Sequence, residues 1–90
     1  MMDNEQFAAM VESILPSPNP AWQLRGAMVA LLHLGHSRQA LELNLAACAD
    51  RARDRESDDE WDAIADATDF LNGWSGGATI PPLPHEEPSA

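Results

Sequence analysis

The feature that most constrains this fold is a helical repeat of apolar residues, which occurs in four separate stretches of the chain. In each stretch an apolar side chain recurs every three or four positions, the spacing that places such residues on one face of an α-helix. The four stretches cover residues 4–15, 20–34, 38–53 and 58–72. Prolines, glycines and charged runs separate them, and prolines and glycines in particular end helices. The sequence therefore predicts an all-α fold, a small four-helix bundle-like domain.

The connection between the second and third predicted helices is unusually short. Gly35 suits the position just past the end of the helix at 20–34, and Ser37 suits the N-cap of the helix at 38–53. Only His36 lies between them. A connection of this length predicts a tight antiparallel hairpin of the two helices.

The inner faces of the last two predicted helices are assigned to particular residues. For the helix at 38–53 the expected inner face consists of Leu41, Leu45, Cys48 and Ala52, widened by Ala40, Ala46, Ala47 and Ala49. For the helix at 58–72 it consists of Trp61, Ile64, Ala65, Thr68 and Leu71. Ser57 and Glu60 have the spacing of a capping box, which predicts that the last helix begins after Ser57.

The composition changes near residue 74, and this change predicts the domain boundary. Residues 1–74 form a single helical domain in this interpretation, and residues 75–90 form a Gly/Pro-rich tail that is extended or disordered. The tail contains a Pro-Pro-Leu-Pro run at 81–84, a loose match to polyproline recognition motifs. Trp74 stands at the boundary, where it either covers the core or anchors a partner.

The charge balance restricts the kinds of partner. The chain has 15 acidic residues, 5 arginines and no lysine, for a formal net charge of −10. A chain this acidic repels nucleic acid and anionic membranes, so we predict no direct binding to either. No apolar run is long enough to span a bilayer, and the single cysteine cannot form an internal disulfide. These features predict a cytoplasmic protein whose partner presents a basic surface.

The acidic residues are concentrated on the last predicted helix. Asp58, Asp62, Asp66 and Asp69 follow spacings of four, four and three residues, and Asp59 adds a charge beside them. That spacing stacks them along one face of a helix, where like charges repel. We predict that these aspartates, together with Trp74, bind the partner.

Three functions are compatible with such a face. The first is a non-enzymatic protein-binding module, an adaptor, regulator or inhibitor that docks on a basic surface. The second is a nucleic-acid mimic that inhibits a DNA- or RNA-binding protein, as inhibitors of bacterial or phage origin do. The third is a structural subunit of a larger assembly. A homodimer would add buried area to so small a core.

Few residues of this chain are of the types that bind metals or act in catalysis. His33 and His36 lie three residues apart and Cys48 follows on the next helix, a set without a standard zinc spacing. We expect His33 to be partly buried, His36 to be a turn residue and Cys48 to be a buried structural thiol. No glycine loop precedes a helix in the way that phosphate binding requires. The sequence therefore predicts no enzymatic activity, no metal and no cofactor.

Overall fold

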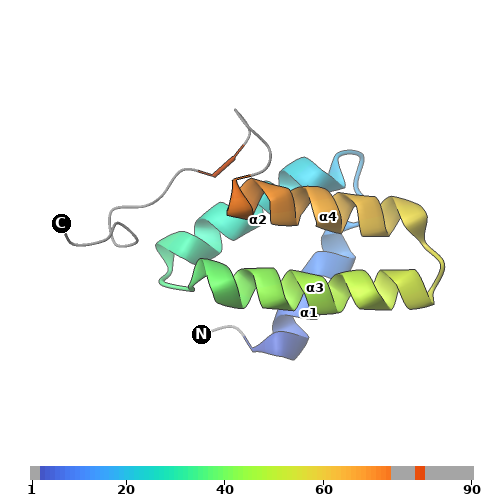
Figure 1. Cartoon of the computed structure of the whole chain (residues 1–90), viewed down its shortest axis with the longest axis horizontal. Helices are drawn as coiled ribbons and strands as arrows, with labels where there is room; N and C mark the ends of the chain where they lie inside the picture. The colour runs from blue at the N-terminus through green and yellow to red at the C-terminus, as the bar shows by residue number, and fades with distance from the viewer. Residues whose placement is uncertain (1–2, 74–78, 81–90) are drawn as a thin grey trace.

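Four α-helices make up the fold. The computed structural model describes residues 3–73 and 79–80, and Figure 1 shows the arrangement. The helices are α1 (Asn4–Ile14), α2 (Pro20–His33), α3 (Arg38–Asp54) and α4 (Asp58–Asn72). These bounds lie within one residue of the predicted ones, and the described part of the chain contains no strand. The all-α prediction is therefore confirmed.

Two helices, α2 and α3, pack on α4. The first helix, α1, contacts α2 and α3 of its own chain. In Figure 1, α3 and α4 lie side by side and α1 crosses behind them. The turn between α2 and α3 is as short as predicted, but α3 packs mainly on α4. The guanidinium of Arg38, at the start of α3, donates a hydrogen bond of 2.8 Å to the carbonyl of Leu71 near the end of α4. This contact places a cation at the negative end of the α4 dipole.

A single hydrophobic core joins the four helices. It includes Phe7 and Val11 of α1, Leu24 and Met28 of α2, and Leu45 of α3, each at most 2% exposed. The inner face predicted for α3, from Leu41 to Ala52, is buried. Full burial of an aliphatic or aromatic side chain contributes roughly 1.5–3 kcal/mol, so the packing of these faces is the main source of stability.

The ends of α1 and α2 follow from local sequence. Asp3 and Gln6 form a capping box. The backbone N–H of Gln6 donates to the Asp3 carboxylate at 2.8 Å, and the backbone N–H of Asp3 donates to the side-chain oxygen of Gln6 at 3.0 Å. At the end of α2, Gly35 adopts a φ of 101°. The His36 amide then reaches the Leu31 carbonyl and the Gly35 amide reaches the Leu32 carbonyl. This is a Schellman motif, and its left-handed position favours glycine.

The turn between α3 and α4 differs from the prediction. Ser57 is the N-cap of α4, as expected, but its hydroxyl donates to the Glu60 carboxylate at 2.7 Å and caps no backbone amide. The predicted capping box is therefore incorrect in its bonding. The reason is that the Ser57 backbone amide donates to the Ala52 carbonyl, while the Glu60 carboxylate accepts from the Ser57 hydroxyl and from Arg55.

The buried face of α4 is rotated from the predicted one, and the buried face of α3 is narrower than predicted. The buried residues of α4 are Ala63, Ile64, Ala67, Phe70 and Leu71, whereas Trp61, Ala65 and Thr68 are half-buried. Because α4 packs against both α2 and α3, its inner face is centred near Ala67. On α3, Ala40, Ala46 and Ala47 are exposed, and so is His33 of α2, contrary to the predictions for them.

The core extends past the predicted domain boundary at residue 74. Ile80 lies in the range predicted as a tail, yet its side chain is 2% exposed and belongs to the core. Its amide donates a 2.8 Å hydrogen bond to the carbonyl of Phe70 in α4. The boundary was predicted from glycine and proline content, which gives no sign that one apolar side chain of this range packs into the core. The Pro-Pro-Leu-Pro run at 81–84 lies outside the described residues.

Candidate functional site

The acidic residues of α4 face solvent. Asp58, Asp59, Asp62 and Asp66 are exposed, and we refer to these four as the acidic face. Asp69, the fifth predicted member, is half-buried. Because α4 buries the opposite side against α2 and α3, the helix holds the four carboxylates in a fixed row. Trp74, predicted to act with them, lies outside the described residues.

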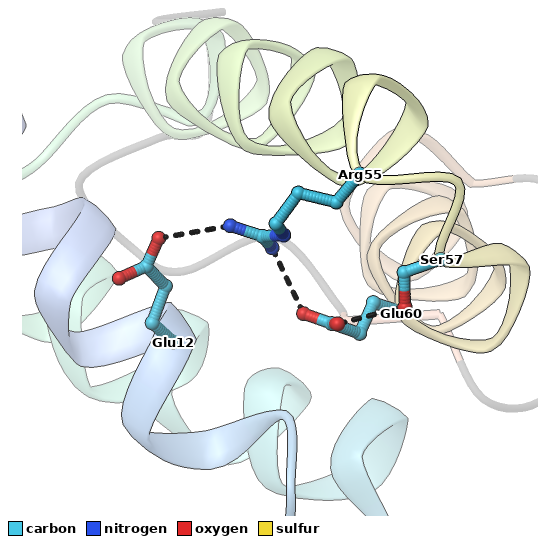
Figure 2. A network of polar contacts seen from close by, with 4 residues as sticks. All are labelled: Glu12, Arg55, Ser57 and Glu60. Carbon is cyan, nitrogen blue, oxygen red and sulfur yellow. Dashed lines mark hydrogen bonds and ion pairs between the residues drawn. The ribbon is translucent and has the colours of Figure 1, made fainter.

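The ion pairs between described residues do not involve the carboxylates of the acidic face. Arg55 pairs with Glu12 at 3.3 Å and with Glu60 at 2.9 Å. Figure 2 shows its guanidinium between Glu12 of α1 and Glu60 of α4. These side chains are a third to a half exposed, so each pair is worth at most about 1 kcal/mol. The network links three elements at the end of the molecule where α3 turns into α4.

A groove lies beside the acidic face. It has a volume of about 350 Å³ and runs between the α1–α2 connection and α4. One wall consists of Pro18, Asn19, Pro20, Ala21 and Trp22, and the other consists of Asp59, Asp62, Ala63 and Asp66. Three of the four carboxylates of the acidic face therefore line the same groove. Sequence reasoning placed the carboxylates on one face but did not find the wall opposite them.

Trp22 is the largest side chain of that wall. It is 58% exposed. One contact that holds it is with Phe70 of α4, whose ring centroid lies 5.4 Å away with the two ring planes at 29°. The guanidinium carbon of Arg25, one turn further along α2, lies 5.8 Å from the Trp22 ring centroid. The indole is thus held by an aromatic neighbour and already faces a cation.

The residues considered for metal binding or catalysis lie apart from the groove. Cys48 is 6% exposed. Burial raises the pKa of its thiol, an effect that Glu12 reinforces and that Arg51 and Arg55 partly oppose. The thiol is therefore protonated at neutral pH and is a poor nucleophile or ligand. Among the described residues, no group of three or more His, Cys, Asp or Glu side chains is arranged to hold a metal ion.

None of the helices in the described part of the chain is long and apolar enough to cross a bilayer. Comparison of the chain with protein-family models, with curated proteins and with solved structures finds no match, so its function is inferred from the acidic face and the groove beside it.

Proposed function

We propose that this protein is a small, non-enzymatic binding module that docks on a basic surface of a partner protein through the acidic face of α4. The observation that carries the proposal is the exposure of Asp58, Asp59, Asp62 and Asp66 along one rigid helix. The ion pairs between described residues use other carboxylates, those of Glu12 and Glu60.

The electrostatics of α4 favour a positively charged partner. Asp58, Asp62 and Asp66 follow one another at four-residue spacing, and like charges so spaced destabilise a helix by about 0.2–0.5 kcal/mol per pair. A basic surface laid against the helix relieves this repulsion. The net charge of −10 also attracts such a surface from a distance, which speeds association at low salt.

The test compares two double variants of equal charge. Asp62→Asn/Asp66→Asn neutralises two carboxylates of the acidic face, whereas Asp50→Asn/Asp54→Asn neutralises two exposed carboxylates of α3 with the same spacing. A partner captured from the host is purified, and its association rate is measured with each variant at low and physiological salt. We expect the α4 variant to associate about three- to ten-fold more slowly, with a weaker salt dependence, and the α3 variant to behave like the wild type.

The same measurements separate the other two functions. A nucleic-acid mimic would displace DNA or RNA from its target, so simultaneous binding of protein and nucleic acid would exclude it. A structural subunit would bind through apolar area, and its association would be insensitive to salt. Equal rates for the two double variants would contradict the docking role of the acidic face.

A further inference from the structure

We infer that the groove between the α1–α2 connection and α4 is a receptor for an arginine side chain of the partner, with Trp22 as its aromatic wall and Asp59, Asp62 and Asp66 as its charged wall. This inference rests on the proposed function and gives it a specific contact. The acidic face would provide attraction over a distance, and the groove would select one side chain at its centre.

The aromatic wall suits a planar cation. Trp22 keeps 58% of its surface exposed, although indole rings are large and are favoured in the cores of small domains. Its stacking on Phe70 at 5.4 Å holds the ring in place, so little side-chain entropy remains to be lost on binding. The guanidinium of Arg25 lies 5.8 Å from the ring centroid, so this ring already attracts a guanidinium within its own chain. Because Phe70 also stacks on the ring, the partner's arginine takes the place of Arg25. Exposed tryptophans of this kind are frequent at the energetic centres of interfaces.

The charged wall suits a guanidinium better than an ammonium group. Asp59, Asp62 and Asp66 line one wall of the groove from successive turns of α4, so a cation in the groove has several carboxylates along its length. A guanidinium carries five donors in a plane, pairs with carboxylates in a bidentate manner and stacks on aromatic rings. A lysine ammonium is compact and strongly hydrated, and it gains less from an aromatic wall.

The size of the groove agrees with a single side chain. Its volume of about 350 Å³ is near the lower limit of pockets that hold small molecules, roughly 300–1,000 Å³. Ala21, Ala63 and the two prolines give it apolar surface along which the methylene stem of an arginine can lie.

The experiment uses two defined probes, a hexa-arginine and a hexa-lysine peptide, titrated into the full chain. Binding is followed by calorimetry and by the indole N–H resonance of Trp22, assigned from its loss in the Trp22→Phe variant. We expect the wild type to bind hexa-arginine about two- to five-fold more tightly than hexa-lysine. Trp22→Leu should remove this preference, whereas Trp22→Phe, which keeps an aromatic face, should retain part of it. Leu43→Ala removes an exposed apolar side chain of α3 and should have no effect.

The outcomes separate this inference from the proposed function. If Trp22→Leu keeps the wild-type preference for arginine, or if the wild type has none, the arginine receptor is wrong. The acidic face still stands in that case, provided that Asp62→Asn/Asp66→Asn weakens both peptides more than Asp50→Asn/Asp54→Asn does. If the two double variants bind alike, both ideas fail. Far-UV circular dichroism of each variant confirms that its helices are intact.

Discussion

At the scale of single residues, Cys48 shows how burial controls ionisation in this protein. Its side chain is 6% exposed on the inner face of α3, and desolvation raises the pKa of the thiol above its ordinary value of 9.0. The chain has no lysine and no tyrosine, so few other groups titrate in the alkaline range. Cys48 is therefore the side chain through which alkaline pH acts on folding.

The sign of this effect follows from linkage. In the unfolded chain the thiol loses its proton near pH 9.0, while the folded protein still holds it, so the stabilisation is complete below that pH. As the pH rises from there through the higher pKa of the folded state, the free energy of unfolding falls. We expect urea unfolding between about pH 8.5 and 10.5 to show this decline in the wild type. The Cys48→Ala variant should show a flat profile, and an equal decline in that variant would contradict the assignment.

At the scale of a helix, the end of α3 carries a strained residue. Glu56 has a φ of 55°, in the left-handed region. The Ser57 amide bonds to the Ala52 carbonyl and the Glu56 amide bonds to the Arg53 carbonyl. This is the same Schellman motif that Gly35 forms after α2, but here the left-handed position holds a residue with a Cβ atom. A non-glycine residue in this conformation costs about 1–2 kcal/mol.

Replacing Glu56 with glycine should therefore stabilise the protein. We expect Glu56→Gly to raise the free energy of unfolding by about 1 kcal/mol, which corresponds to a rise in Tm of roughly 4–8 °C for a domain of this size. Thermal unfolding followed by circular dichroism measures it. The Glu56→Gln variant removes the same charge but keeps the Cβ atom, so it separates backbone strain from electrostatics. If Glu56→Gln stabilises as much as Glu56→Gly, the effect is one of charge.

At the scale of the whole molecule, the core is small and is completed by a residue far along the chain. The four helices enclose the core of Phe7, Val11, Leu24 and their neighbours, and Ile80 joins it after α4 has ended. A domain of this size buries a smaller fraction of its surface than a larger one, so each buried side chain accounts for a large share of the net stability.

Shortening the Ile80 side chain should show how much it contributes to the stability of the fold. We expect Ile80→Ala to lower the free energy of unfolding by about 2–5 kcal/mol, because it removes transfer energy and leaves a cavity. The milder Ile80→Val should cost about 0.5–1.5 kcal/mol. Urea unfolding of both variants measures the difference. An Ile80→Ala protein as stable as the wild type would show that the folded domain ends with α4.

What the sequence determined by itself is the set of helices and the positions of their ends. Apolar periodicity, Gly35 and Ser37 act within one or two turns of the chain, so their effect can be predicted without knowledge of the fold. The inner face of α3, from Leu41 to Ala52, was found for the same reason.

Only the tertiary structure decided which side of α4 is buried, where Trp22 points and that Ile80 belongs to the core. The apolar residues of α4 span a wide arc, and its contacts with both α2 and α3 select Ala63, Ala67 and Phe70 as the inner face. The groove forms because Trp22 of α2 and Asp62 of α4 line its two walls. Such placements depend on contacts between residues distant in sequence, which no local pattern encodes.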